Sequence, residues 1–465
     1  MTSTKSAERI EHDSLGEVRL PAEALFGPQT QRAVDNFPVS GRPMPLAFID
    51  ALCRLKAACA QGNHEIGALD TARAEAITSA VDQLVVGLAA GRFLEAFPID
   101  VYQTGSGTSS NMNANEVIAH IAGAEAGVHP NDHVNMSQSS NDVVPSAIRL
   151  MSVRRVENDL LPALAHLEAI LLARARELRD VVKTGRTHLM DATPIRFDQV
   201  FEGYVEQLKG WRLALEQARD RNLALPLGGT AVGTGLNAPQ GFAVAAVDAL
   251  NCALEREQPF TRQSQPTVGM SVQDDSLALS SALRGVAAFL HKLANDLRWM
   301  NSGPLAGLGE ITLPALQPGS SIMPGKVNPV VPESVAMVAV QMQGLDHAIA
   351  MAAQSGNFEL NVMFPLVAAN LDQMITLAAN ASRLLADKAI AGFTVNHERI
   401  ERDLAANPIL VTALNPVIGY EAGAAIARRA YAEGRSVLDV ALEMTDLDQA
   451  TLAELLDPRG LTGDR

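Results

Sequence analysis

The sequence predicts an all-α protein, and two observations lead to that fold class. Apolar residues make up 47% of the 465 residues, but aromatic residues make up only 4%. The core is therefore built mainly from Leu, Val, Ile, Met and Ala, which suit close helix packing better than the aromatic-rich faces of sheets. In addition, five segments repeat apolar residues at intervals of three and four, which is the spacing of one helix face.

Residues 1–139 predict an N-terminal, mostly helical domain of short elements. Residues 17–21 read as a brief extended segment, and helical patterning follows over about 45–90. A hydroxyl-rich glycine turn at 104–113 then leads into a predicted helix that reaches Ile121.

Residues 140–394 predict a central domain of five long helices, each with an apolar stripe. The stripes consist of Leu160, Leu164, Leu167, Leu171, Ala175 and Leu178; of Phe197, Phe201, Tyr204, Leu208, Trp211 and Leu215; of Leu283, Val286, Leu290, Leu293 and Leu297; of Val335, Val338, Met342, Leu345 and Ile349; and of Val367, Leu371, Met374, Ala378, Ala381 and Leu385. This sustained spacing favours helices packed nearly parallel, as in a bundle. Apolar residues off the stripes, namely Val340, Met351, Ile375 and Leu384, indicate that more than one face is buried, so we expect an oligomer.

Residues 395–465 predict a small C-terminal helical domain of unknown role, with two short helical patterns. The glycine-rich segment 227–235 is the one stretch similar in composition to a dinucleotide-binding loop. That fingerprint needs a strand before the glycines, whereas a long predicted helix precedes this segment. We interpret the segment as a packed turn at the end of the bundle.

Charge and cysteine content exclude several classes of protein. The net charge of −15, without clustered Lys and Arg, argues against a nucleic-acid partner. Cys53, Cys59 and Cys252 are too few and too scattered for a disulfide framework or a zinc site, which fits a reducing cytoplasm. The N-terminus lacks an apolar core of signal-peptide length, and no run approaches the roughly 18 apolar residues that span a bilayer. We expect a soluble, cytoplasmic protein.

The segment 319–329 combines Gly and Pro with reactive side chains, and neither a helix nor a strand tolerates that composition. The predicted loop ends where residues 332–334 open a long apolar segment, so a helix N-terminus there favours an anion such as a carboxylate. Ser320 is able to act as a base only as an alkoxide, which needs backbone donors and positive charge nearby. Lys326 is the nearest cation in sequence. The alternative interpretation is an exposed connecting loop.

Three further polar segments are candidates for binding. The hydroxyl groups and amides of 104–113 either cradle an anion or cap the helix that follows. In the segment 129–142, His129 and His133 are spaced like metal ligands on a helix, but the turn residues Pro130 and Asn131 interrupt them. Because no Glu or Cys completes a ligand set, we do not expect a metal site here.

Ser140 or Asn141 is expected to cap the helix after this segment. The last candidate is an irregular linker at 184–194, which holds His188 among hydroxyl groups. A lone histidine of this kind is more often structural than catalytic.

Residues 319–328, Gly-Ser-Ser-Ile-Met-Pro-Gly-Lys-Val-Asn, resemble the signature loop of the fumarase/aspartase superfamily. The Met-Pro-Gly-Lys version is similar to that of the class II fumarases, and the resemblance extends from Glu11 to Pro416. It implies a three-domain fold and a homotetramer in which five helices per subunit build a twenty-helix core. It also implies that each active site collects loops from three subunits.

The resemblance further implies roles for individual residues. The catalytic residues are Ser320 as the base and His188, which is polarised by Glu333. The substrate-binding residues are Ser106, Gly107, Thr108, Ser139, Ser140, Asn141, Thr187, Ser321, Lys326, Val327 and Asn328. A secondary anion site consists of His129, Pro130, Asn131 and Asp132.

The implied activity is the reversible hydration of fumarate to (S)-malate in the tricarboxylic acid cycle, through an aci-carboxylate carbanion and without a metal or organic cofactor. An aspartate ammonia-lyase of the same superfamily is the closest alternative, but aspartases usually carry glutamine where this chain has His188. Gly325 also favours a fumarase. An inactive structural homologue is the second alternative, and the intact Ser320, Lys326 and Asn328 argue against it.

Overall fold

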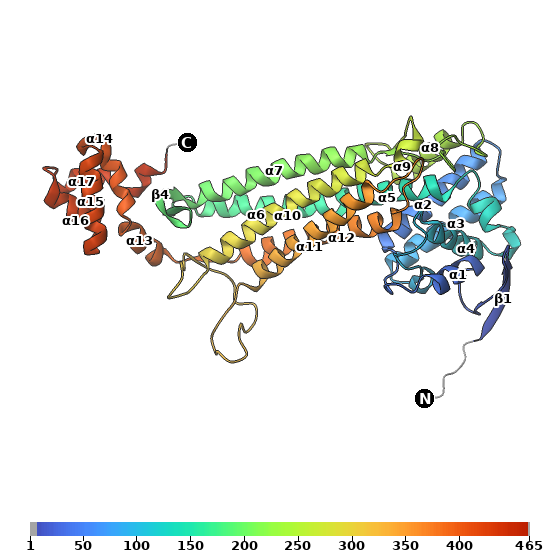
Figure 1. The fold of residues 1–465 in the computed structure, drawn as a ribbon, viewed down its shortest axis with the longest axis horizontal. Coiled ribbons are helices and arrows are strands. Elements are labelled where there is room, and N and C mark those ends of the chain that lie inside the picture. The colour runs from blue at the N-terminus through green and yellow to red at the C-terminus, as the bar shows by residue number, and fades with distance from the viewer. Residues whose placement is uncertain (1–6, 464–465) are drawn as a thin grey trace. The chain divides into compact units, whose positions relative to one another are not determined.

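The computed structural model describes residues 7–463. Helices dominate the described chain, and its strands form only two-stranded sheets, which confirms the all-α prediction (Figure 1). The chain divides into two compact units. Unit 1 comprises Met1–Leu161, Leu213–Gly285 and Gln341–Ala378; unit 2 comprises Pro162–Arg212, Val286–Val340 and Ala379–Arg465.

Unit 1 begins with three short elements and then two helices of 20 and 19 residues, so the expectation of only short elements in this region is wrong. These elements are β1 (Glu8–Asp13), β2 (Gly16–Pro21), α1 (Pro28–Asn36), α2 (Leu46–Glu65) and α3 (Thr71–Ala89). Strand β2 confirms the extended segment expected at 17–21, and α2 and α3 account for the helical patterning over 45–90. The pattern divides into two helices because Asp70 accepts a hydrogen bond from the Arg73 amide and starts α3.

Helices α4 (Thr108–Ala122) and α5 (Ser140–Arg155) follow, separated by a 3₁₀ turn, η2 (Ala124–Ala126), and a π-helical turn, η3 (Pro130–Val134). We expected Ser140 or Asn141 to cap α5, and this prediction is wrong, because the N-cap lies one or two residues earlier. Ser139 is the N-cap: its hydroxyl accepts from the Asn141 amide, and Asp142 accepts from the Ser139 amide. This reciprocal capping box satisfies two amides that a cap at Ser140 would leave unpaired.

The five predicted long helices are all present. They are α6 (Leu161–Glu177), which continues from α5 through η4 (Val156–Leu160), α7 (Phe197–Arg221), α10 (Asp274–Met300), α11 (Val330–Ala353) and α12 (Phe364–Leu385). Every residue of the five predicted stripes is buried except Trp211 and Val338, which are half-buried. Because the apolar periodicity was sustained over several turns in each segment, it located these helices correctly.

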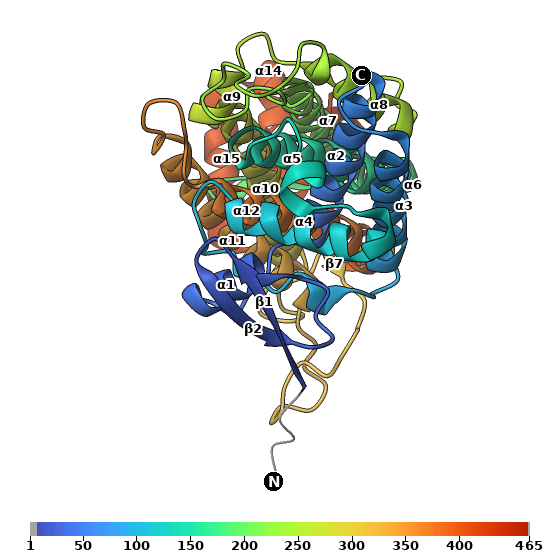
Figure 2. The same cartoon turned by 90° about the vertical axis from the view of Figure 1, so that its right-hand side faces the viewer.

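Polar contacts tie the long helices to one another within each unit. In unit 1, Ser280 on α10 donates to Asp346 on α11 at 2.6 Å, and Arg155 at the end of α5 donates to Asp372 on α12 at 3.1 Å. In unit 2, the Tyr204 hydroxyl on α7 donates to Asp296 on α10 at 2.6 Å. In each unit these helix segments lie side by side, and Figure 2 shows them from one end.

Two of the apolar residues off the stripes remain accessible in the single chain. Val340 is 62% exposed and Met351 is 45% exposed, whereas Ile375 is fully buried. The second apolar face is therefore partly uncovered on α11.

The remaining elements are short. They are α8 (Phe242–Leu254), α9 (Pro266–Ser271), β5 (Ala224–Leu225), β6 (Thr261–Arg262), β7 (Ile311–Thr312) and β8 (Thr394–Val395). Residues 227–235 form successive turns, in agreement with the turn that we predicted there, and α7 and the two-residue β5 precede them.

The C-terminal region has its own small apolar core. Its helices are α13 (His397–Ala405), α14 (Asn415–Ile418), α15 (Tyr420–Glu433), α16 (Val437–Met444) and α17 (Gln449–Leu455). Leu414, Ile426, Val440 and Leu452 are fully buried in that core. The region is helical, as expected, while the domain boundaries at 139/140 and 394/395 stay a prediction. Within 7–463, no helix is both long and apolar enough to cross a membrane.

Candidate active site

The first candidate cluster lies at the N-terminus of α4 in unit 1. Gly107 is the N-cap, with φ of +74°, and the hydroxyl groups of Ser106 and Thr108 bond to each other at 2.8 Å. The side chain that caps this turn is Gln103, whose Oε1 accepts from the Ser110 amide at 2.9 Å. Since neither Ser106 nor Thr108 caps the helix, the capping interpretation of these two residues is wrong. They line the start of the helix, where its dipole favours an anion.

The backbone of this turn has no room for larger residues. A Cβ atom on Gly105 would lie 2.0 Å from the Val362 carbonyl oxygen, and one on Gly107 would lie 2.8 Å from Val144. Residues 105 and 107 must therefore be glycine for the turn to pack against its neighbours.

The second cluster, Ser139, Ser140 and Asn141, begins α5 and is connected to the first. Asn111 on α4 donates from Nδ2 to the Ser140 hydroxyl at 3.0 Å. Asn141 donates to the Ala231 carbonyl at 2.9 Å, so the glycine-rich turn packs against the start of α5. The structure thus brings the two hydroxyl clusters of unit 1 together at two adjacent helix N-termini.

A buried carboxylate organises this region, and we did not single it out from the sequence. Asp142 is completely buried and accepts from the amides of Ser139, Gly228 and Thr230 at 2.9, 2.8 and 3.0 Å. Burial raises the pKa of its carboxyl group. The spacing Ser139-x-x-Asp142 is the signal that was available, because a hydroxyl residue followed three positions later by an acid is typical of a capping box.

His188 lies on a β-hairpin in unit 2, so the irregular linker that we expected is wrong. Strands β3 (Val182–Thr187) and β4 (Met190–Arg196) pair antiparallel, with Thr187 opposite Met190. The two turn residues, His188 and Leu189, have φ of +56° and +61°. Two-residue hairpins favour this left-handed geometry but usually use Asn or Gly for it, so the sequence carried no turn signal. Strain of this kind at non-glycine residues concentrates at functional sites.

A buried ion cluster fixes the base of this hairpin. Glu310 is 3% exposed and binds Lys183 at 3.2 Å and Arg186 at 2.7 Å, both from β3. Burial lowers the pKa of the Lys183 ammonium. The tip residues Thr187 and His188, in contrast, are exposed.

The signature loop is confirmed as irregular backbone in unit 2. The Gly319 amide donates to the Lys326 carbonyl at 2.9 Å, and Asn328 donates from Nδ2 to the Gly319 carbonyl at 2.5 Å. These two bonds close the loop. A Cβ atom on Gly319 would lie 2.3 Å from the Lys326 carbonyl oxygen, so this closure requires glycine.

The structure of the loop distinguishes Ser320 from Ser321, whereas the composition of the segment does not. The Ser320 hydroxyl accepts from the amides of Ile322 at 3.3 Å and Met323 at 3.0 Å. No hydrogen bond reaches the Ser321 hydroxyl from any described residue. Two backbone donors aimed at one oxygen stabilise negative charge on it, as an alkoxide base requires.

Other expected partners are not in contact. Glu333 lies half-buried in the first turn of α11, and no hydrogen bond joins it to His188 anywhere in 7–463. Lys326 is exposed and makes no side-chain bond to Ser320 within the same range. The hydroxyl clusters of α4 and α5 belong to unit 1, whereas the hairpin, the signature loop and Glu333 belong to unit 2.

The predicted secondary anion site borders a cavity of about 540 Å³ in unit 1. His129, Pro130 and Asn131 line it, but Asp132 does not. His129 accepts from the Asp132 amide at 3.2 Å, and His133 accepts from the His129 amide at 2.8 Å. No group of three or more potential metal ligands gathers in the described part of the chain.

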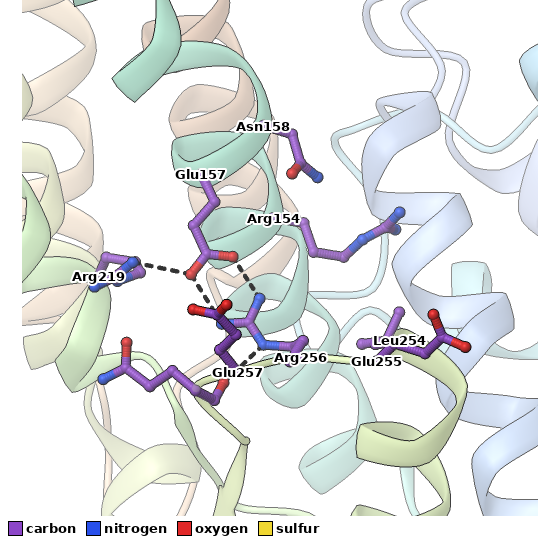
Figure 3. A pocket seen from close by; sticks show the side chains of 9 residues that line it. Arg154, Glu157, Asn158, Arg219, Leu254, Glu255, Arg256 and Glu257 are labelled. Carbon is purple, nitrogen blue, oxygen red and sulfur yellow. Dashed lines mark hydrogen bonds and ion pairs between the residues drawn. The ribbon is translucent and has the colours of Figure 1, made fainter. Parts of the chain in front are cut away.

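A different cavity, of about 410 Å³, contains none of the predicted residues. Glu157 binds Arg219 and Arg256 in its wall, with Arg154 and Asn158 beside them (Figure 3). Arg219 and Arg256 are already paired with Glu157, and Glu255 and Glu257 add negative charge to the wall, so this cavity does not suit a dicarboxylate and is not the candidate active site.

Comparisons with known proteins show which family this chain belongs to. Residues 16–344 match the lyase family, and residues 410–463 match the fumarase C C-terminal family. The chain is 56% identical to fumarate hydratase class II 2 of Pseudomonas aeruginosa, over 98% of both chains. It is 48% identical to fumarate hydratase class II of Mycobacterium tuberculosis, over 98% of this chain and 92% of that one.

Solved structures give the same result for the fold. A class II fumarase from Schistosoma mansoni matches with a TM-score of 0.94 and 35% identity, over 98% of this chain and 99% of that one. A fumarate lyase:delta crystallin from Brucella melitensis, bound to cobalt, matches with a TM-score of 0.93 and 41% identity, over 98% and 100%. The identity, the coverage and the fold together show that this chain belongs to the lyase family and, within it, to the class II fumarases.

Proposed function

We propose that the protein is a fumarate hydratase, which adds water to fumarate reversibly to give (S)-malate in the tricarboxylic acid cycle. One observation carries the proposal: the Ser320 hydroxyl accepts from two backbone amides inside a loop that also presents Lys326 and Asn328. Removing the C3 proton of malate needs a strong base and a stabilised carbanion. This loop supplies groups suited to both requirements.

Each candidate residue then has a role in the reaction. Ser320 takes the C3 proton, and Lys326 and Asn328 stabilise the aci-carboxylate dianion that forms, with help from Thr187 and Asn141. His188 and Glu333, acting through a water molecule, handle the departing hydroxyl group. The remaining residues hold the substrate carboxylates: Ser106, Gly107, Thr108, Ser139, Ser140, Ser321 and Val327.

The substrate charge explains why the site uses helix N-termini. The chain carries a net charge of −15, so a dicarboxylate is repelled except where positive groups gather. The starts of α4 and α5 offer backbone amides and hydroxyl groups without any exposed carboxylate, since Asp142 is buried behind them.

A homotetramer with shared active sites accompanies this proposal. The exposed Val340 and Met351, together with Met337 at 68% exposure, leave an apolar face on α11 that another copy would cover. We also assign the enzyme to the cytoplasm, where Cys53, Cys59 and Cys252 stay as the free thiols seen here. Light scattering that gives a monomer at micromolar concentration would contradict the assembly.

The ultraviolet absorbance of fumarate tests the activity directly. With malate as substrate, the purified protein is expected to produce fumarate, and with aspartate it is expected to produce none. His188 and Gly325 favour this outcome over an ammonia-lyase. Fumarate formed from aspartate alone would reverse the assignment, and none from either substrate would indicate an inactive homologue. The rate with malate is expected to be unchanged in EDTA, since we assign no metal to the reaction.

A further inference from the structure

Helix α2 in unit 1 carries a cation that is completely buried. Lys56 has an exposed fraction of 0%, and its Nζ donates to Asn135 Oδ1 at 3.1 Å and to Gln138 Oε1 at 2.8 Å. Among residues 7–463, no carboxylate lies within 4 Å of this ammonium. An ammonium buried without a paired carboxylate is strongly disfavoured unless something else requires its charge.

The other buried cations of the described chain are paired differently. Each has a carboxylate within ion-pair distance: Arg149 with Asp275 at 2.9 Å, Arg174 with Glu177 at 2.5 Å, and Lys183 with Glu310 at 3.2 Å. Lys56 alone is held by neutral amide oxygens. No ion pair within 4 Å in the described chain neutralises its charge, although the carboxylate of Asp142 at the start of α5 acts on it from farther away, so its field also reaches the start of α5.

The partners of Lys56 lead directly to the start of α5. Asn135 Oδ1 accepts from Lys56 and also from Nδ2 of Asn111 at 3.1 Å and of Asn115 at 3.2 Å. Asn111 then donates from the same Nδ2 to the Ser140 hydroxyl at 3.0 Å. An unbroken hydrogen-bond chain thus runs from the ammonium through two amides to a hydroxyl of the candidate substrate site.

The second partner also has a fixed orientation. Gln138 donates from Nε2 to the carbonyls of Val134 at 3.0 Å and Met136 at 3.1 Å, which leaves its Oε1 pointing at Lys56. The ammonium therefore sets the direction of both amide groups that precede the Ser139–Asn141 cluster.

Three titratable groups act on Lys56. Cys53 and Cys59 lie on the same helix, and Asp142 lies at the start of α5; the neighbouring side chains of α4 and of 135–138 are amides. Burial, the largest influence, lowers the pKa of Lys56 to about 8. Because burial raises the pKa of both thiols to about 12, the thiols stay neutral where Lys56 titrates.

We propose that Lys56 is a positioning residue of the substrate site, which orients Ser140 through Asn135 and Asn111 and attracts a substrate carboxylate by its buried positive charge. The proposal rests on the proposed function, because it takes the anion to be a dicarboxylate such as fumarate.

Lys56→Met tests the proposal, and Asn63→Ala is its matched control. Asn63 lies on the same helix, is equally buried, and bonds to the same segment through the Met136 carbonyl and the Ser137 hydroxyl. It has no bond to Asn111 or Ser140 in the described chain. Both changes remove a buried polar contact between α2 and 135–138, but only the first removes a charge.

Fumarate binding is measured by calorimetry from pH 6.5 to 9 in a Ser320→Ala background, in which turnover of the ligand is expected to be strongly slowed. The Ser320→Ala protein that keeps Lys56 is expected to bind fumarate more weakly as the pH rises past about 8, where the Lys56 ammonium loses its proton. Lys56→Met is expected to bind roughly tenfold more weakly at pH 7, with no inflection near 8. Asn63→Ala is expected to keep the inflection.

Two results would overturn the proposal while leaving the function intact. One is a folded Lys56→Met protein with unchanged fumarate affinity and pH dependence. The other is an equal change in Asn63→Ala, which would reduce Lys56 to structural support. If the Ser320→Ala protein binds fumarate with the expected inflection but the enzyme with Ser320 intact never hydrates it, only the proposed function is contradicted. A protein that binds no fumarate would contradict both.

Discussion

The two regions that carry the candidate residues differ in how completely the single chain fixes them. At the starts of α4 and α5, buried side chains cross-link the hydroxyl clusters: Asn111 bonds to Ser140, and Asp142 accepts three backbone amides. The signature loop and the tip of the β3–β4 hairpin are exposed, and short-range bonds within each hold their shape. We refer to the first as the binding region and to the second as the reaction region.

This difference between the two regions corresponds to different requirements for binding and for reaction. Binding a carboxylate requires donors whose positions do not change, and the binding region provides them within one unit. The reaction region holds the proposed base Ser320 with two backbone donors and a histidine on a strained turn, but no hydrogen bond joins His188 to Glu333 in the described chain. In the tetramer with shared active sites that we propose, contacts from other subunits would complete it.

The largest expected effect falls on the reaction region. Ser320→Ala removes the base, and a base acting on a weak carbon acid contributes roughly 10²–10⁴-fold, so turnover should fall by at least that order. Fumarate binding should survive, because the binding region is intact. Deuterium exchange at C3 of malate in heavy water measures the step directly. If the variant still exchanges at near the wild-type rate, Ser320 is not the base.

A somewhat smaller loss is expected for His188→Asn. In the dehydration of malate the departing hydroxide needs protonation near neutral pH, and the hydration of fumarate passes through the same transition state. Hydration should therefore fall on the order of 10²-fold without any gain of ammonia addition. Because His188 lies outside the apolar helix stripes, the proposed tetramer should stay intact. Steady-state hydration rates measure the loss of activity, and light scattering measures the oligomeric state. An unchanged turnover number would remove His188 from the mechanism.

Much of the fold followed from the sequence because its cause is local. The five long helices were predicted from stripes such as Leu283–Leu297, where every third or fourth residue is apolar and all are now buried. Where the cause is a distant contact, prediction failed. The hairpin at 182–196 depends on Glu310, which binds Lys183 and Arg186 from more than a hundred residues away.

The candidate site divides in the same way. The loop around Ser320 was predictable from its Gly and Pro residues, since they act on their own backbone. Lys56, Asn111 and Asn135 were not predicted, because their roles arise only when α2, α4 and the start of α5 pack together. The available signal was the helical spacing, because the residues three and four positions from Lys56 (Leu52, Cys53, Cys59 and Ala60) are all apolar and place it on a buried face of α2.

In the binding region, replacing Asp142 is expected to lower the free energy of unfolding. In Asp142→Asn, an amide NH₂ group would face backbone donors from Ser139 or from Gly228 and Thr230, which leaves buried groups unpaired. Each such loss costs about 1–3 kcal/mol, so the free energy of unfolding should fall by that amount. Denaturant unfolding measures it, with Asp387→Asn as an exposed control. Equal stability of both variants would show that the buried carboxylate does not organise this region.

The smallest effect is expected for Ser321→Ala, and it separates the two serines of the reaction region. Unlike Ser320, Ser321 is exposed and its hydroxyl receives no backbone donor in the described chain, so no feature there stabilises an alkoxide on it. Its hydroxyl is then available to bind substrate, in the ground state and the transition state alike. The Michaelis constant for fumarate should rise roughly tenfold or less, with kcat nearly unchanged. Steady-state kinetics of both serine variants decide the assignment, because a fall in kcat at Ser321 as large as that at Ser320 would mean that the backbone donors do not select the base.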